Sequence, residues 1–271
     1  MPTRRRLLAF AAVLPLVACA AVPAPDSGAD LTVVTFNIWH DMGDWPARRP
    51  LVIAALRDMD ADVIALQEVL QDTDLPNQAE DIARALGGYS VHFVSVDPPE
   101  QARRYGNAVL SRLPVLETGE LRLRPLEDSR TLAMVRVSVN GRPVQIAATH
   151  LHHTPEGGAL RERQINDVLA AVEAQEDAPT VLLGDFNAPT DAPEFAPVFS
   201  GYTDALEAAD PAAAARSTLV TDHGHRSARI DHIFVQQGRF EVLSAGLAAD
   251  RAVAGVWPSD HVAVVARLRV R

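Results

Sequence analysis

Six short segments of the chain each place a polar or charged residue beside an apolar run that has the composition of a β-strand. They are TFN ending at Asn37, LQE at Glu68, ATH at His150, GDFN with Asp185 and Asn187, RIDH with Asp231, and SDH with Asp260 and His261. A charged group at the end of a buried strand is hard to explain by packing, because unpaired charges are rarely found inside a core. We therefore expect the six segments to meet in one site.

The segment Gly184-Asp185-Phe186-Asn187 carries the strongest chemical signal. In an extended chain Asp185 and Asn187 point to the same side, and Gly184 permits a close approach of the backbone. A carboxylate and an amide in this arrangement can take a proton from a water molecule and hold that water in line with a phosphorus atom. The alternative is that Asp185 or Asn187 caps a helix.

Histidines close to carboxylates form the second part of the pattern. Asp231 with His261 is the candidate pair, because an Asp that binds an imidazole fixes its tautomer and favours the imidazolium, which stabilises charge on a phosphoryl oxygen. His150 alone at a strand end is more often structural, so its catalytic interpretation depends on its neighbours. Three further histidines have no such partner pattern and are predicted to lie on loops or the surface: His223, His225 and His232.

Oxygen ligands favour magnesium over zinc at this site. Glu68 follows an apolar run and can present a hard oxygen ligand to Mg²⁺, although a surface charge at a strand end is an equal alternative. Asn37 alone could be a turn residue. The spacing of His150 and His152 is seen in metal sites, but zinc normally needs more nitrogen or sulfur ligands than the chain supplies.

Composition limits the classes of function. The chain has 271 residues, 48% hydrophobic and 22% charged, which is enough to bury a large core. Every basic residue is Arg and the net charge is −10, so there is no overall attraction to nucleic acid or anionic lipid. A Walker loop, a dinucleotide fingerprint and a GxSxG elbow do not occur in the sequence, so nucleotide-driven, redox and serine-esterase chemistry have no support.

The N-terminal region is predicted to be an export signal. Residues 1–19 combine an arginine run with an apolar stretch, 7–17, that is too short for a stable transmembrane helix. The last four of these residues, Leu16-Val17-Ala18-Cys19, resemble the bacterial lipoprotein box, in which the Cys is lipidated. We predict a flexible tether at 20–30 and one catalytic domain at 31–271.

Helical and extended patterns alternate along that domain. Helices are expected around residues 52–59, with Pro50 in the first turn, and around 79–86 and 165–172. Strands are expected at 31–36, 62–66, 89–96, 107–110, 131–139, 143–149, 181–183 and 262–270. Asn140-Gly141 predicts a two-residue hairpin turn. The pattern indicates an α/β fold with parallel and antiparallel strand pairs.

Strand direction must allow the six segments to meet. Asn37, Glu68, His150 and Asp185 follow their strands, whereas two other carboxylates, Asp231 and Asp260, precede theirs. A common site therefore requires the last two strands to run antiparallel to the first four. We expect a mixed sheet.

In order and spacing, the six segments resemble the motifs of the endonuclease/exonuclease/phosphatase superfamily, and the match extends from Leu31 to the C-terminus. The run from Tyr105 to Arg112 and the His150 segment followed by Arg161 and Gln164 resemble its exported, sphingomyelinase-like and uncharacterised bacterial members. On sequence alone, Arg161 and Gln164 could equally face solvent. The resemblance implies a four-layer α/β sandwich, with two mixed β-sheets packed face to face and helices outside.

The resemblance also implies roles for individual residues and a Mg²⁺ or Mn²⁺ cofactor. Metal-site residues would be Asn37, Glu68 and Asp260; catalytic residues would be Asp185, which activates water, Asn187, which orients it, His150 and His261, which flank the phosphate, and Asp231, which holds His261; and Asn107 and Arg130 would line the substrate pocket. Here His232 stands where many members carry an aromatic residue.

These observations predict an exported phosphoesterase, anchored on the periplasmic or cell-surface side of a membrane through lipidated Cys19. Phosphodiester or phosphomonoester hydrolysis is expected, on a phospholipid headgroup or another small phosphoester, with no obligate protein partner. The alternative is an exported Mg²⁺-dependent endonuclease or exonuclease with nucleic acid as substrate. An inactive anchored scaffold is the least supported hypothesis, because every motif residue is present.

Overall fold

The structure is a computed structural model that describes residues 29–174 and 178–271. Its strands are β1 (Asp30–Asn37), β2 (Val63–Gln71), β3 (Ser90–Ser95), β4 (Arg104–Ser111), β5 (Val115–Arg122), β6 (Thr131–Val139), β7 (Arg142–His150), β8 (Thr180–Asp185), β9 (Tyr202–Asp204), β10 (Asp231–Gln236), β11 (Phe240–Ala248) and β12 (Ala263–Val270). Its helices are α1 (Trp45–Met59), α2 (Gln78–Leu86), α3 (Gly158–Glu173), α4 (Ala196–Phe199), α5 (Ala205–Ala209) and α6 (Pro211–Ala214), with single 3₁₀ turns η1 (Leu126–Asp128), η2 (Pro193–Phe195) and η3 (Thr221–His223).

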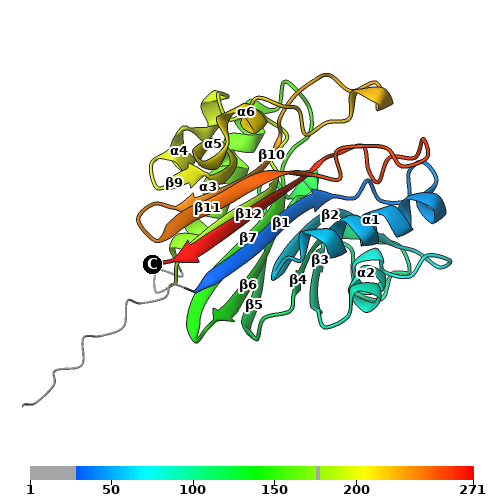
Figure 1. Ribbon diagram of the computed structural model, residues 1–271, viewed down its shortest axis with the longest axis horizontal. Helices are drawn as coiled ribbons and strands as arrows, with labels where there is room; N and C mark the ends of the chain where they lie inside the picture. Colours follow the sequence, from blue (N-terminus) through cyan, green and yellow to red (C-terminus); the bar gives the residue numbers. More distant parts are fainter. Residues whose placement is uncertain (1–28, 175–177) are drawn as a thin grey trace, which may run out of the picture.

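The strands form two six-stranded sheets. The first has the order β11-β12-β1-β2-β4-β3 and the second the order β5-β6-β7-β8-β10-β9. Each sheet contains one parallel pair, β1 with β2 and β7 with β8, while the other neighbours are antiparallel. The predicted mixed sheets are confirmed, and Figure 1 shows how the strands of both sheets run in similar directions.

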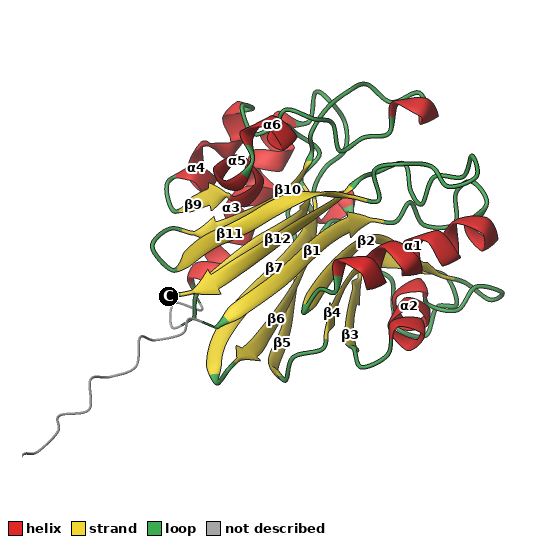
Figure 2. Cartoon of the chain, viewed as in Figure 1, coloured by secondary structure: helices red, strands yellow, loops and turns green. Residues whose placement is uncertain are grey.

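Alternation along the strands builds the layers. Val33 and Ile233 belong to the core between the two sheets, whereas their neighbours Val34 and Phe234 pack on the outer faces. Helices α1 and α2 cover the outer face of the first sheet, and α3 covers that of the second. Figure 2 shows the helices in red on both sides of the yellow strands. The four-layer sandwich is therefore confirmed.

Most predicted elements are present, with altered ends. The first helix begins earlier than predicted: Asp44 caps it by accepting a hydrogen bond from Ala47 N, Pro46 occupies its first turn, and Pro50 lies inside it. The placement of Pro50 in the first turn was wrong, because a better cap and a second proline lie one turn upstream. The Asn140-Gly141 turn is confirmed, and both residues have positive φ, 51° and 84°.

The second strand also differs from the prediction. β2 continues to Gln71, so Glu68 lies inside the strand. The pairing of β2 with β4 shifts register between Leu66 and Val69, and Glu68 has a φ of 59°. A bulge of this kind re-aims a side chain without ending the strand.

Strand directions bring one set of ends together. One end of the sandwich holds the last residues of β1, β7 and β8 and the first residues of β4, β6 and β10. In the second sheet, β6 is antiparallel to β7 and β10 is antiparallel to β8. In the first sheet, β4 is antiparallel to β2, which runs parallel to β1. β12 is antiparallel to β1, so the segment before it also reaches this end. The expected convergence of strand ends is confirmed.

The predicted signal at 1–19, Cys19 and nearly all of the tether lie outside the described residues. Asp30, the last residue of that tether, already pairs with Arg269 in the first sheet. In the part of the chain that the structure describes, every helix is too short or too polar to cross a membrane.

Candidate functional site

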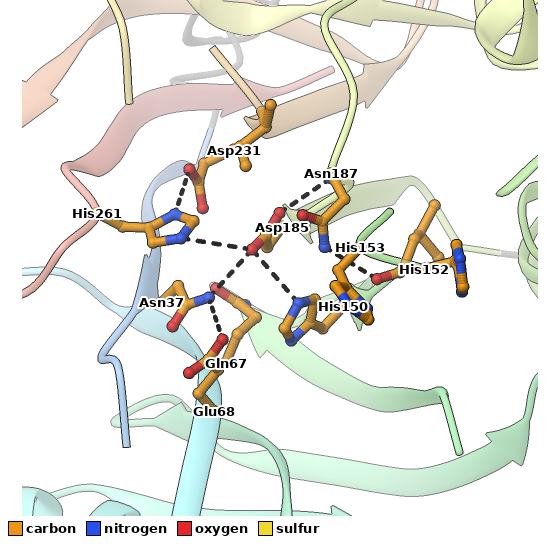
Figure 3. A network of polar contacts seen from close by, with 12 residues as sticks. Asn37, Gln67, Glu68, His150, His152, His153, Asp185, Asn187, Asp231 and His261 are labelled. Carbon is orange, nitrogen blue, oxygen red and sulfur yellow. Dashed lines mark hydrogen bonds and ion pairs between the residues drawn. The ribbon is translucent and has the colours of Figure 1, made fainter. Parts of the chain in front are cut away.

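The buried carboxylate of Asp185 lies at the centre of the converging strand ends, on the floor of a cleft of about 500 Å³. Its Oδ2 atom is 3.0 Å from Asn37 Nδ2, 3.4 Å from His150 Nε2 and 3.8 Å from His261 Nε2. Figure 3 shows these three side chains directed at Asp185 from different elements. Such a focus of donors around one carboxylate is suited to binding and polarising a water molecule.

Strand register accounts for this arrangement. In the second sheet, His150 pairs with Asp185 across the parallel β7 and β8, and Asp231 pairs with Asp185 across the antiparallel β8 and β10. These three side chains therefore lie side by side. Asn37 reaches them from β1 of the opposite sheet, and His261 comes from the segment before β12. Residues distant in sequence are thus positioned by rigid strands.

Backbone geometry at Gly184 makes the close packing of β7 and β8 feasible. A Cβ atom at this position, where φ is 151°, would lie 2.0 Å from the carbonyl oxygen of Thr149. Two residues of the site also have left-handed backbones: Glu68, at 59°, and Asn187, at 56°. Such conformations are uncommon outside glycine and concentrate at functional sites.

Hydrogen bonds from both its backbone and its side chain hold Asn187 in place. Its backbone N–H donates to Asp185 Oδ1 at 2.9 Å, and its side-chain Nδ2 donates to Leu151 O at 3.0 Å. The remaining side-chain oxygen of Asn187, which lines the cleft, can accept a hydrogen bond from a water or a ligand. Helix capping by Asp185 or Asn187, the alternative considered above, does not occur, because neither residue begins a helix.

His261 lies between two carboxylates. Its Nδ1 is 2.9 Å from Asp231 Oδ2, as the sequence pairing anticipated, and its Nε2 faces Asp185. Burial alone would lower the pKa of His261, but the negative charges of Asp231 and Asp185 outweigh burial and raise it. A protonated imidazole at this position can stabilise a negatively charged phosphoryl oxygen.

Asp185 and His150 have shifted pKa values as well. Burial, together with the nearby Asp231 carboxylate, raises the pKa of Asp185 above its usual range. Burial and the charge of Arg130 hold the pKa of His150 well below its usual range, so its imidazole is neutral near pH 7. Asp185 therefore has the character of a base, and His150 that of a neutral hydrogen-bond partner.

The donors along the cleft fit a hard divalent cation. Glu68 lines the cleft with 18% of its side chain exposed, and its Oε1 accepts a hydrogen bond from Asn37 Nδ2 at 3.1 Å. Asn37 Oδ1 accepts from Trp39 N, so its amide nitrogen faces the carboxylates and steadies Glu68. Oδ1 of Asp260 is 3.3 Å from Ser259 Oγ and its Oδ2 is 3.0 Å from His225 Nε2. Carboxylates in a water-accessible cleft are typical Mg²⁺ or Mn²⁺ ligands.

A second cluster could also hold a metal. Ligand atoms of Asp185, Asp231 and His261 all lie within 4.8 Å of one another, and all three residues are buried. However, Nδ1 of His261 is already bound to Asp231, and an imidazolium has no lone pair for a cation. We interpret this cluster as a relay in which Asp231 holds His261 opposite Asp185, and the carboxylates of the cleft fit a cation better.

Arg48 holds the loops of the site in place. Its buried guanidinium donates to five backbone carbonyls, those of Ile38, Trp39, His40, Met42 and Pro258. Burial lowers the pKa of Arg48 to about 10, and the charge of Asp260 partly opposes this shift. The loop after β1 and the segment before β12 are therefore tied to one side chain, which the sequence patterns did not single out.

Asn107 does not reach the cleft, contrary to the prediction. It is buried, and its Nδ2 donates to Thr131 O and Thr131 Oγ1, so it links the two sheets. Tyr105, on the same face of β4, is closer to the strand end and lines the cleft instead, as Arg130 does. Asn107 lies one residue pair further along β4 than Tyr105, and this places it between the sheets.

The structure decides between the two positions left open for Arg161 and Gln164. Arg161 and Gln164 are buried: Arg161 pairs with Glu194, and Gln164 donates to Asp128 Oδ2 and accepts from the backbone N of His152. They support the loop after β7. Helical spacing predicts only that they share one face of α3, and the loop covers that face.

Of the three histidines predicted to lie on loops or the surface, only His232 is placed differently. His232 is fully buried in β10, with contacts to Arg229 and to the carbonyl of Ala188. His225 lines the cleft, as do His153 and Arg226. His223 is exposed and His225 lies on a loop, as expected. The loop that carries His223 and His225 therefore forms part of the cleft wall.

Replacing His261 or His150 by Ala should lower kcat at least ~100-fold, because each removes a positioned donor from the centre of the site. Asp231→Asn should cause a smaller loss, since it leaves the imidazole of His261 in place. The exposed His223→Ala is the control and should cause a much smaller loss than either. Equal losses for His223→Ala and His261→Ala would contradict the assignment of His261 to the reacting centre.

Comparison with known proteins agrees with this geometry. The family model described as the endonuclease/exonuclease/phosphatase family matches residues 34–261. The chain is 27% identical over 157 residues to tyrosyl-DNA phosphodiesterase 2 of Gallus gallus, a match covering 56% of this chain and only 40% of that protein's length.

Solved structures share the fold. The endonuclease/exonuclease/phosphatase from Beutenbergia cavernae DSM 12333 is 28% identical, with a TM-score of 0.70 over 89% of this chain and 72% of the other. D. rerio TDP2 complexed with single-strand DNA product is 20% identical, with a TM-score of 0.77 over 89% of this chain and all of the other. At the latter identity the likeness concerns the fold alone.

Proposed function

The chain belongs to the endonuclease/exonuclease/phosphatase family, and on that premise we propose that it is a divalent-metal-dependent phosphoesterase. The observation that carries the proposal is the convergence of Asn37, His150 and His261 on one oxygen of the buried Asp185. Hydrolysis of a phosphoester needs a base for water and positive charge for the phosphate oxygens. Asp185 and His261 supply these two groups.

In this proposal each residue around Asp185 has a role in hydrolysis of the phosphoester. Asp185 takes a proton from a water molecule while Asn187 orients that water, whose oxygen forms the new bond to phosphorus. His261, held by Asp231, stabilises charge on one phosphoryl oxygen, and neutral His150 donates a hydrogen bond to another. The phosphorus–oxygen bond to the leaving alcohol breaks, and the leaving oxygen takes a proton from solvent in the open cleft.

We place a divalent cation at Glu68, with Asn37 fixing that carboxylate and Asp260 as a further oxygen ligand or a partner of a bound water. Mg²⁺ or Mn²⁺ at this position would act as a Lewis acid on the phosphate oxygens. The proposal rests on three carboxylates of the cleft, those of Glu68, Asp185 and Asp260, which form an oxygen-rich donor set.

We propose two candidate classes of substrate. The favoured substrate is a phospholipid headgroup or another small phosphoester, supported by the predicted anchor and the net charge of −10. The second candidate is an exported nuclease, favoured by the likeness to a relative named for a tyrosyl-DNA phosphodiesterase activity. An inactive scaffold has the least support, because the predicted centre is assembled around Asp185.

Purified protein should be assayed with Mg²⁺ or Mn²⁺ against sphingomyelin, inositol phosphates and plasmid DNA. We expect metal-dependent release of phosphate or phosphoester products from at least one of these substrates. Cleavage of DNA alone would favour the nuclease alternative. Failure on all three, with either ion and with folded protein, would remove the support for the enzyme proposal.

We also propose that the protein is exported and anchored through lipidated Cys19, with residues 20–30 as the tether. Two or more acyl chains hold a protein far more firmly than one, so stable membrane association is expected. Cys19→Ser should release an active protein into the soluble fraction or block its processing. Membrane fractionation that is unchanged in the Ser variant would show that another element provides the attachment.

A further inference from the structure

The cleft extends across the strand ends from one side of the sandwich to the other. Strands β4 and β6 oppose each other at one end of the cleft, β1 and β8 in the middle, and β10 and β12 at the far end. The candidate hydrolytic centre therefore occupies the middle. Arg130, before β6, lies on one wall, and Arg226, in the loop before β10, lies on the other.

Arg130 has hydrogen-bonding capacity that the protein leaves unused. Its NH2 group is 3.2 Å from His153 Nδ1, while its buried Nε has no hydrogen-bond partner among the described residues. The nearest carboxylate oxygen, that of Asp128, is 3.8 Å from Nε, too far for a hydrogen bond. A buried guanidinium nitrogen without an acceptor beside a cleft is suited to an anionic ligand.

Arg226 provides a second cationic group, at the opposite end of the cleft. It is exposed on the cleft wall, and within residues 29–174 and 178–271 no carboxylate pairs with it. The nearby carboxylate of Asp260 is occupied by His225, whose Nε2 is 3.0 Å from Asp260 Oδ2. Arg226 is therefore available to a ligand.

The loop that carries Arg226 is fixed to the site. Val220 N donates to Asp260 O at 2.8 Å, and Leu219 forms a β-bridge with His261. On its outer side, Trp257 Nε1 donates to Asp222 Oδ2 at 3.1 Å. These contacts hold the loop at a set position beside the reacting centre.

We infer that the Arg226 end of the cleft is a second anion subsite, so that the substrate carries a further phosphate beside the scissile one. This inference rests on the proposed function, because it takes the scissile phosphate to lie at Asp185. A headgroup with a cationic amine would place that amine near Arg130 or Arg226, which is unfavourable. A substrate with repeated phosphates can instead place an anionic group near each of the two arginines.

A pair of chromogenic substrates isolates the second phosphate. Thymidine 5′-(p-nitrophenyl phosphate) and its 3′-phosphorylated form differ only by one phosphate, and hydrolysis at the 5′-phosphorus releases p-nitrophenolate from both. We expect kcat/KM to be about tenfold higher for the 3′-phosphorylated substrate, the scale of one charge-assisted contact in a partly exposed cleft. Arg226→Ala should reduce this ratio to near one.

Arg239→Ala is the matched control, because Arg239 is exposed in the turn at the opposite end of β10 and should leave the ratio unchanged. Binding in chelator gives a second readout that needs no turnover. Calorimetry should show thymidine 3′,5′-bisphosphate binding about tenfold more tightly than thymidine 5′-monophosphate, and Arg226→Ala should abolish the difference.

The two proposals fail in different ways. Equal kcat/KM for both substrates, or equal binding of the two nucleotides, would overturn the second subsite while leaving the phosphoesterase proposal intact. Absence of metal-dependent turnover with tighter bisphosphate binding would support the subsite and contradict the enzyme proposal. Competition by oligothymidylate or by an inositol bisphosphate then identifies which source of repeated phosphates the cleft prefers.

Discussion

Replacing Asp185 by Asn should lower kcat by roughly 10⁴-fold, the upper range for loss of a positioned base. The substitution preserves shape but removes the oxygen on which Asn37, His150 and His261 converge. It also removes one of the two negative charges that raise the pKa of His261. Steady-state kinetics at saturating Mg²⁺ and Mn²⁺ provide the measurement.

Folding should be largely unaffected by this substitution. Burial raises the pKa of Asp185, so its ionised form is less favourable in the folded protein than in water, and an amide avoids that cost. The control is Asp191→Asn, an exposed carboxylate in the loop after β8, which should keep full turnover. If Asp185→Asn retained more than a tenth of the activity, another group would have to be the base.

Strand direction was the part of the site that could be argued from the sequence. Asn37, Asp185 and Asp231 adjoin apolar runs, and only one set of relative directions brings them together. The observed pairing of Asp231 with Asp185 and of His150 with Asp185 has those directions. The catalytic and metal roles of these residues stay predictions until they are tested.

Two of the unpredicted strands lacked a burial signal. Strand β5 is exposed along almost its entire length, and it is held as an edge strand by hydrogen bonds to β6. Backbone hydrogen bonding does not depend on side-chain type, so no periodicity marks such a strand. Strand β11, at the edge of the first sheet, is only partly buried and has the same weakness.

The wrong assignment of His232 has a different cause. Asp231 and Ile233 face the site and the core between the sheets, so alternation turns His232 outward, where Phe186, Phe195 and Phe234 surround it. Its polar nitrogens are satisfied there by Arg229 and a backbone carbonyl. A histidine can be buried when such partners exist, and only the folded neighbours reveal them.

Glu68→Gln should lower kcat/KM by about 10³-fold at low Mg²⁺, because an amide replaces the charged oxygen ligand proposed for the cation. The same variant should require at least about tenfold more Mg²⁺ for half-maximal activity, and excess chelator should abolish turnover of the unmodified protein. Activity measured across a metal titration gives both values. Glu120→Gln, at an exposed position on β5, is the control with unchanged metal dependence.

The same titration locates the cation. If the ion were bound by the relay of Asp185, Asp231 and His261, then Asp231→Asn would raise the metal requirement and Glu68→Gln would not. We expect the reverse, because His261 Nδ1 is already engaged by Asp231 at 2.9 Å. By contrast, Glu68 Oε2 is 3.8 Å from His40 Nε2, and Glu68 lines the cleft. Full turnover of the unmodified protein in excess chelator would contradict both placements and the metal dependence itself.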